Sequence, residues 1–252
     1  MSRLSVTVIT YNEEDNLSRC MESLKGLADE VIVVDSGSDD ETVSIARKYG
    51  GKVFFRKFDD FSSQKNWAVS KASSEWILSL DADEQLSEEL ADEIKEAIKN
   101  KNYLGYLIPR RNFILGAEIK HSRWSPDKHI WLWRKDFGKW VGNVHEEVMV
   151  RGMVGQLKNS KIHYSHKTLS DFLKSNNLYS TLLAHQMSRN KTDFSFVKMF
   201  WEAIFEFNIR FFYKMGFLDG WRGFVLAYLM AIYKLTVWIK IWELESKDQK
   251  HK

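Results

Sequence analysis

The pattern of apolar and polar positions changes period several times over the first hundred residues. Residues 4–10 and 31–34 are short runs of β-branched and other apolar residues, which is typical of strands that are buried on both faces. Residues 14–25 instead carry apolar side chains three or four positions apart, the spacing of an amphipathic helix. The chain therefore opens with a strand, a helix and a second strand.

The same alternation continues to about residue 100. The further elements that the pattern predicts are strands over residues 52–55 and 76–80 and helices over residues 39–48, 62–71 and 87–100. Strands that alternate with helices predict an α/β fold, a Rossmann-like and mostly parallel sheet flanked by helices. Beyond residue 100, strand-like runs at 103–108 and 130–134 enclose a loop-like stretch around Pro126, where we expect loops that select a substrate.

From residue 169 onward the pattern is helical and contains no proline. Charged residues recur there at every fourth position, at Lys198, Glu202, Glu206, Arg210 and Lys214. Phenylalanine, tryptophan and isoleucine fill most positions between them, and water alone does not stabilise such a helix. We therefore expect an α/β domain over residues 1–165 and a helical, aromatic-rich extension over 166–252. The extension meets a membrane surface or, alternatively, packs in a bundle or against a second subunit.

Charge and hydropathy indicate how this extension meets a membrane. Residues 1–150 carry 21 basic and 26 acidic side chains, whereas residues 151–252 carry 16 and 8. The basic half favours an anionic surface, and nucleic acid is not among the partners we expect. The best apolar stretch, residues 223–233, ends at Lys234, short of the roughly 18 residues that a spanning helix needs. We therefore expect the extension to lie on the membrane rather than to cross it.

The single cysteine, Cys20, cannot form an internal disulfide, and no charged-then-apolar leader precedes the first strand. Both features favour a cytoplasmic protein over a secreted one.

Polar and acidic residues gather where three of the predicted strands end. Tyr11, Asn12 and Glu13 follow the first strand, Asp35 follows the second, and an Asp-Ala-Asp triplet at residues 81–83 follows the strand over 76–80. The carboxyl ends of parallel strands share one edge of a sheet, where ligands bind. Paired carboxylates there can bind Mg²⁺ or Mn²⁺, which holds a diphosphate; a solvated turn that caps the next helix is the alternative.

Four segments and the tail together resemble the family 2 glycosyltransferases of the GT-A fold, with the nearest likeness to bacterial lipopolysaccharide-core β-glucosyltransferases. The segments are VTVITYNEEDNL, EVIVVDSGSDDET, SSQKNWAVSKASSEWILSLDADE and GNVHEEV, and the tail segment is GFLDGWRGFVLAYLMAIYKL. The resemblance implies a nucleotide-sugar donor, a metal ion and inversion at the anomeric carbon. The Gln-x-x-Arg-Trp signature of processive synthases is absent, so we expect transfer of one sugar per acceptor.

The resemblance also assigns roles to single residues. It implies that Tyr11, Asn12 and Glu13 line the nucleoside pocket, that Asp35 contacts the base, that Asp81 lies near the ribose, that Asp83 is the principal metal ligand and that Lys65 reaches the nucleotide. For Lys65, an ordinary exposed helix lysine is the alternative. From its residue type, Arg134 is a further candidate, because an arginine fork suits the departing diphosphate.

An acceptor hydroxyl must lose a proton as it attacks, so the reaction needs a general base. Glu146 is the residue we expect in this role, with Glu147 and His145 as alternates, because this triplet stands where the family carries an acidic pair. The alternative is a salt-bridged surface acid.

The expected donor is UDP-glucose, and the expected acceptor is a lipid-linked glycan such as lipopolysaccharide core at the cytoplasmic face of the inner membrane. The competing functions are a sugar nucleotidyltransferase and a non-catalytic membrane-associated scaffold. A dinucleotide-dependent oxidoreductase is disfavoured, since no Gly-x-Gly-x-x-Gly follows the first strand.

Overall fold

The computed structural model describes residues 3–142 and 146–250, with side chains described as far as residue 246. The chain divides into two compact units. Unit 1 contains the residues up to Arg111 together with Asp127–Tyr164, and unit 2 contains Asn112–Pro126 together with the residues from Ser165 onward. The expected domain division after residue 165 stays a prediction; by their contacts, residues 112–126 belong to unit 2.

The physical reason lies in the small apolar cluster of unit 2. Ile114 and Ile119, from the segment expected to be a loop, are buried against Phe172, Leu226 and Leu229. The segment forms the end of one strand, a short partner strand and a turn of 3-10 helix (Ser122–Trp124) rather than an irregular loop.

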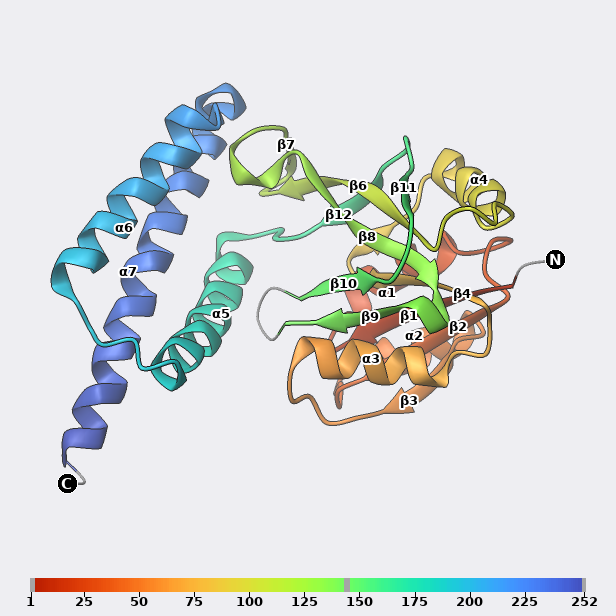
Figure 1. Cartoon of the computed structure of the whole chain (residues 1–252), viewed down its shortest axis with the longest axis horizontal. Helices are drawn as coiled ribbons and strands as arrows, with labels where there is room; N and C mark the ends of the chain where they lie inside the picture. Colours follow the sequence, from red (N-terminus) through yellow and green to blue (C-terminus); the bar gives the residue numbers. More distant parts are fainter. Residues whose placement is uncertain (1–2, 143–145, 251–252) are drawn as a thin grey trace. The chain divides into compact units, whose positions relative to one another are not determined.

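The strands of the chain are β1 (Leu4–Thr10), β2 (Glu30–Asp35), β3 (Lys52–Phe55), β4 (Trp76–Asp81), β5 (Glu84–Gln85), β6 (Gly105–Ile114), β7 (Ala117–Ile119), β8 (Asp127–Arg134), β9 (Gly138–Val141), β10 (Glu147–Val150), β11 (Val154–Gln156) and β12 (Lys161–Tyr164). The helices are α1 (Glu14–Glu22), α2 (Thr42–Lys48), α3 (Phe61–Lys71), α4 (Glu88–Ala97), α5 (Leu169–Arg189), α6 (Phe196–Asn208) and α7 (Gly220–Lys250). Figure 1 labels these elements along the chain.

Within the described residues, ten strands form one mixed sheet, whose main path runs β3-β2-β1-β4-β8-β6-β12-β5. The strands β3, β2, β1 and β4 pair in parallel, and β8 then joins β4 antiparallel. The predicted α/β fold with a largely parallel sheet and flanking helices is confirmed. A separate antiparallel pair, β9 and β10, was not predicted.

The core of unit 1 explains why the central strands form. Leu4, Val6 and Val8 of β1 are fully buried, as is Cys20 of α1, and the apolar residues of β2 and β4 belong to the same cluster. The Cys20 Sγ lies 3.8 Å from the carbonyl oxygen of Asp81, at the end of β4. Burial raises the pKa of the Cys20 thiol well above its usual value.

In unit 2, α7 runs alongside both α5 and α6 (Figure 1). Buried residues from all three helices form one cluster: Ala184, Met199, Tyr233, Val237, Trp238 and Ile241. In the part of the chain that the structure describes, one helical segment, Gly216–Ser246, is long and apolar enough to cross a membrane, since a stretch of 18 residues within it has a mean hydropathy of 1.6. Lys234 and Lys240 interrupt this segment, and the prediction that the extension lies on a membrane rather than crosses it stays a prediction.

The buried carboxylate of Glu30, at the start of β2, links β1, β3 and the loop before β4. Glu30 accepts hydrogen bonds from the Ser5 hydroxyl, from the backbone and hydroxyl of Ser73 and from the Lys52 ammonium at 2.8 Å. Burial alone raises a carboxyl pKa, but these donors outweigh it and lower the pKa of Glu30 to about 2.

Glu30→Gln should reduce the free energy of unfolding at pH 7 by about 2 kcal/mol, because hydrogen bonds to a charged group are the stronger ones. The folded pKa lies below the ordinary value of 4.5, so this stabilisation is fully present above that pH. It should disappear as the pH falls from about 4.5 towards 2. Urea denaturation of both proteins across this range measures the difference. Glu22→Gln, at an exposed carboxylate, is the matched control, and an equal loss in both variants would contradict the interpretation.

Candidate active site

The strand register brings the predicted strand-end residues together. Ile9 lies opposite Asp81 across the β1–β4 pair, and Thr10 lies opposite Asp35 across the β1–β2 pair. The loops after β1 and β2 are joined by hydrogen bonds from the Asn12 side chain, whose amide donates to Asp39 at 2.7 Å and accepts from the Asp39 backbone at 3.1 Å. The expectation that the three clusters share one edge of the sheet is confirmed.

Asp35 shapes the loop in which it lies. One carboxylate oxygen accepts from the hydroxyls of Thr10 and Ser38, and the other accepts from the backbone amides of Gly37 and Ser38 at 2.8 and 2.9 Å. Gly37 adopts a φ of +101°, which the turn requires and which glycine tolerates best. Four donors already satisfy this carboxylate, and its predicted contact with a nucleobase stays a prediction.

The other nucleoside-pocket candidates lie at the same edge. The Tyr11 side chain is 61% exposed, and Asn12 adopts a left-handed φ of 53°. The backbone amide of Glu13 donates to the Thr42 hydroxyl at 2.7 Å, which ties the loop to the start of α2. An exposed aromatic ring on an anchored loop offers a stacking surface for a base.

Lys65 of α3 is a buried bridge between two carboxylates. Its ammonium lies 3.1 Å from Asp81 Oδ1 and 2.9 Å from Glu146 Oε1, and its side chain is only 3% exposed. The same ammonium lies over the rings of Trp140 and Trp131, 4.5 and 5.7 Å from their centres. Burial disfavours its charge, but Asp81 and Glu146 outweigh burial and raise the pKa of Lys65. The exposed-lysine alternative is therefore wrong.

Helix α3 is fastened to the hairpin that leads to Glu146. The side-chain amide of Asn66 donates to the Trp140 carbonyl at 2.9 Å and accepts from the Trp140 amide at 3.0 Å. The Ser62 hydroxyl donates to the carbonyl of Gly142. These contacts hold both ends of the Lys65–Glu146 bridge in place.

The three candidates for the general base differ in placement. Glu146 is largely buried, with a side chain 16% exposed, and it contacts Lys65. Glu147 is exposed at the start of β10, opposite Val141. His145 lies outside the described residues. Of the two described candidates, Glu146 is the one that Lys65 links to Asp81.

Asp83 contacts a histidine that the sequence analysis did not select. His163 Nε2 lies 3.1 Å from Asp83 Oδ2, and the backbone amide of Tyr164 donates to the Asp83 carbonyl. Although burial alone lowers it, the Asp83 carboxylate raises the pKa of His163. The pairing of β12 with β5 creates this contact, and no sequence spacing could have shown it.

The acidic pair at the end of β4 fits a divalent cation. Mg²⁺ is commonly held in proteins by one or two carboxylates, with substrate phosphates and water completing its shell. Asp81 and Asp83 supply that number of carboxylates at one strand end. Across residues 3–142 and 146–250, no group of three or more His, Cys, Asp and Glu side chains is arranged to hold a metal ion. The remaining ligands would therefore have to come from substrate and water.

A second buried charge cluster supports the turn that contains Asp83. Glu84 accepts hydrogen bonds from Lys161, from Arg110 at 3.3 Å and from the backbone amide of Asp81 at 3.0 Å. The Lys161 ammonium lies 3.1 Å from the centre of the Trp131 ring. Burial lowers the pKa of Lys161 to about 8. The sequence analysis missed this cluster, because its members come from four different strands.

The prediction that Arg134 contacts the diphosphate is wrong. Arg134 lies opposite Trp76, at the start of β4, where it pairs with Glu75 and covers the Trp76 ring. Asp81 ends the same strand, about 16 Å away at roughly 3.3 Å per residue. Strand β8 runs antiparallel to β4, so its last residue lies at the edge opposite the strand-end carboxylates.

The fold and this edge define a glycosyltransferase that uses a nucleotide sugar. Residues 5–154 match glycosyl transferase family 2, and an uncharacterized glycosyltransferase of Rickettsia typhi is 32% identical, covering 99% of this chain and 90% of the relative. The chain belongs to glycosyltransferase family 2, and its sheet and flanking helices are consistent with the GT-A fold.

A second relative is a lipopolysaccharide core biosynthesis glycosyltransferase, LpsC of Rhizobium meliloti. It is 28% identical over 95% of this chain and 92% of its own. Among solved structures, S. aureus TarS in complex with UDP-GlcNAc is similar with 19% identity and a TM-score of 0.48, covering 92% of this chain and 81% of that one.

Lys65→Met should lower the free energy of unfolding by about 3 kcal/mol, because two partly buried carboxylates lose the cation between them. The matched control is Lys71→Met on the same helix, at an exposed lysine, which should cost less than about 1 kcal/mol. Urea denaturation at pH 7 measures both. Equal losses in the two variants would show that the bridge adds nothing to stability.

Proposed function

We propose that this protein transfers a single sugar from a UDP-sugar, with UDP-glucose the first choice, to a lipid-linked glycan, and that the transfer inverts the anomeric centre. The observation that carries the proposal is the Lys65 bridge, which joins the Asp81 carboxylate at the donor edge to Glu146. Two carboxylates that share one ammonium lie close together, which would let one act on the donor side and the other on the acceptor side of the same sugar.

The donor half of the site uses the strand-end residues. Tyr11, Asn12 and Asp35 would surround the nucleoside, and Asp83, with Asp81, would hold Mg²⁺ or Mn²⁺. When bound, the cation supplies positive charge that stabilises the departing nucleoside diphosphate. His163, 3.1 Å from Asp83, positions that carboxylate and is a further candidate ligand through its imidazole nitrogen.

The acceptor half of the site uses Glu146. Its carboxylate accepts the proton of the acceptor hydroxyl while the hydroxyl oxygen attacks the anomeric carbon and the bond to the diphosphate oxygen breaks. Lys65 holds the Glu146 carboxylate in a fixed position, and the contacts of α3 with the β9 end keep that position rigid. Fixing the base in advance lowers the entropic cost of reaching the transition state.

The acceptor assignment rests on two observations. LpsC, named as a lipopolysaccharide core biosynthesis enzyme, matches along nearly the whole chain. Unit 2 also exposes many large apolar side chains on α6 and α7, as a protein with a lipid-linked substrate would. The proposed location is peripheral, on the cytoplasmic face of the inner membrane.

Calorimetric titration with UDP, GDP, ADP and UDP-glucose, with Mn²⁺ or with EDTA, tests the donor site. We expect binding of UDP and UDP-glucose that requires Mn²⁺ and that weakens at least about tenfold in Asp83→Ala, since a divalent cation links carboxylate and diphosphate. Asp92→Ala, at an exposed carboxylate of α4, should bind as the unmodified protein does.

Absence of nucleotide binding in a folded protein would sink the transferase proposal and favour the scaffold. Formation of inorganic diphosphate from UTP and glucose 1-phosphate would favour a nucleotidyltransferase instead.

Glu146→Gln should lower kcat by about 100-fold or more, the range expected when a general base is removed. The Kd for UDP with Mn²⁺ should change little, because Glu146 is assigned to the acceptor side. UDP release from UDP-glucose with detergent-dispersed lipid A-core as acceptor measures kcat. Glu147→Gln, at the neighbouring exposed acid, is the control; a larger loss there would transfer the base assignment to Glu147.

A further inference from the structure

Helix α6 exposes most of its large apolar side chains and buries a charged one. Its buried residues are Met199, Ala203 and Glu206. Its exposed large apolar residues are Phe196, Val197, Phe200, Trp201, Ile204 and Phe205. A surface helix of a water-soluble protein places its apolar stripe inward and its charges outward. Helix α6 buries a glutamate beside Met199 and Ala203 and leaves six large apolar side chains exposed.

The charges of this region are paired inside unit 2. Glu206 accepts hydrogen bonds from Arg210, one turn further on, and from Arg123 at 3.0 Å. Glu202 pairs with Lys234 of α7 at 3.5 Å. The middle of the predicted charged stripe therefore faces neighbouring segments, whereas Lys198 and Lys214 at its two ends are exposed. Paired charges inside and large apolar side chains outside are the arrangement expected of helices that contact lipid.

The exposed apolar side chains continue from α6 to the first half of α7, and we call this surface the membrane face. Beyond α6 it contains Phe212, Tyr213, Met215, Phe217, Leu218, Trp221, Phe224 and Tyr228. A groove of about 280 Å³ between α6 and α7, lined by Phe200, Ile204, Phe207, Tyr228 and Leu235 among others, opens on it. Large contiguous apolar patches on the surface of soluble proteins mark interaction sites.

Basic side chains accompany the membrane face. Lys198 and Lys214 are exposed, and Arg222 is half-buried. Lys214 lies 5.7 Å from the centre of the Tyr213 ring, and Arg222 lies 4.6 Å from that of Trp221. Basic side chains that lie along aromatic rings at an apolar surface can reach lipid headgroups while the rings enter the acyl region. Their charge is complementary to anionic lipid.

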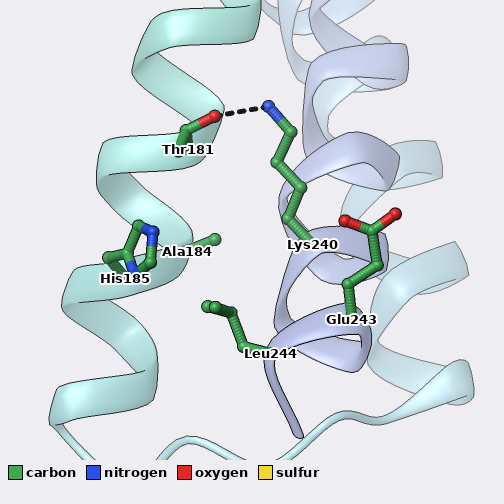
Figure 2. A pocket seen from close by; sticks show the side chains of 6 residues that line it. All are labelled: Thr181, Ala184, His185, Lys240, Glu243 and Leu244. Atoms are coloured by element: carbon green, nitrogen blue, oxygen red, sulfur yellow. Dashed lines mark hydrogen bonds between the residues drawn. The ribbon is translucent and has the colours of Figure 1, made fainter. Parts of the chain in front are cut away.

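The C-terminal half of α7 has a different environment. Lys240 donates hydrogen bonds to the backbone and side chain of Asn177 and to the hydroxyls of Ser180 and Thr181, all on α5. Figure 2 shows the Lys240 side chain directed at Thr181. These polar groups fasten α7 to a helix of unit 2, whereas a spanning helix would place them in hydrocarbon.

We propose that the membrane face inserts into one leaflet of an anionic bilayer, with α6 and the first half of α7 lying in the plane of the interface, and that α7 does not cross the bilayer. The occupant is lipid rather than a second copy of the chain, since the basic residues match anionic headgroups. This inference needs no donor or acceptor, so it stands or falls separately from the proposed transfer reaction.

The test is flotation of the full chain with vesicles of phosphatidylglycerol and phosphatidylcholine in equal amounts, without nucleotide. We expect the chain to float with these vesicles, less so with phosphatidylcholine alone, and to be released by an alkaline carbonate wash. The double variant Trp201→Glu with Phe205→Glu should bind at least about tenfold more weakly, since it removes two large apolar side chains from the lipid-facing set. Both positions are exposed, so the fold should persist, as circular dichroism verifies.

The matched control is Leu173→Glu with Leu178→Glu, at exposed apolar positions of α5, outside the membrane face. It should float as the unmodified chain does. Equal losses in the two double variants, or unchanged flotation of the first, would overturn the proposal. Resistance to the carbonate wash would overturn the in-plane arrangement. A dimer that dissociates in the first variant, without vesicle binding by the unmodified chain, would assign the face to a second copy.

Discussion

The arrangement of the candidate site depends on one buried ammonium group between two carboxylates. Lys65 would be costly to bury alone, because a charge loses its hydration there. Asp81 and Glu146 repay this cost, and the rings of Trp140 and Trp131 fill the remaining space. The requirement to pair this charge fixes α3, the end of β4 and the approach to β10 relative to one another within unit 1.

Both units contain buried, paired charges, but the pairing has a different structural effect in each. In unit 1, Glu84 pairs with Arg110 and Lys161 and accepts a hydrogen bond from the Asp81 amide, which supports the turn that contains Asp83. In unit 2, the pairing of Glu206 with Arg210 and Arg123 removes charge from the outside of α6. The pairing in unit 1 supports a polar edge of the sheet. The pairing in unit 2 leaves the outer surface of α6 apolar, which is unfavourable in water.

The local pattern of apolar and polar residues was sufficient to predict the parallel part of the sheet and the acidic residues at its edge. The strands over residues 4–10 and 52–55 have the predicted bounds, since buried parallel strands appear in the sequence as continuous apolar runs.

The assignment of Arg134 failed because the direction of β8 is set by its pairing with β4, which a strand-like pattern does not encode. His163 and Lys161 were missed for a related reason: their partners are about 80 residues earlier in the chain. The second helix begins at Thr42 rather than at residue 39, because Asp40 accepts from the Thr42 amide.

The burial of Cys20 has a practical consequence for spectroscopy. Its thiol is enclosed beneath the end of β4, and burial raises its pKa, so it stays protonated and unreactive at neutral pH. The chain has no other cysteine. It therefore behaves towards maleimide and spin-label reagents as a cysteine-free protein, and a single cysteine introduced on an exposed helix would carry the label without replacement of the native residue.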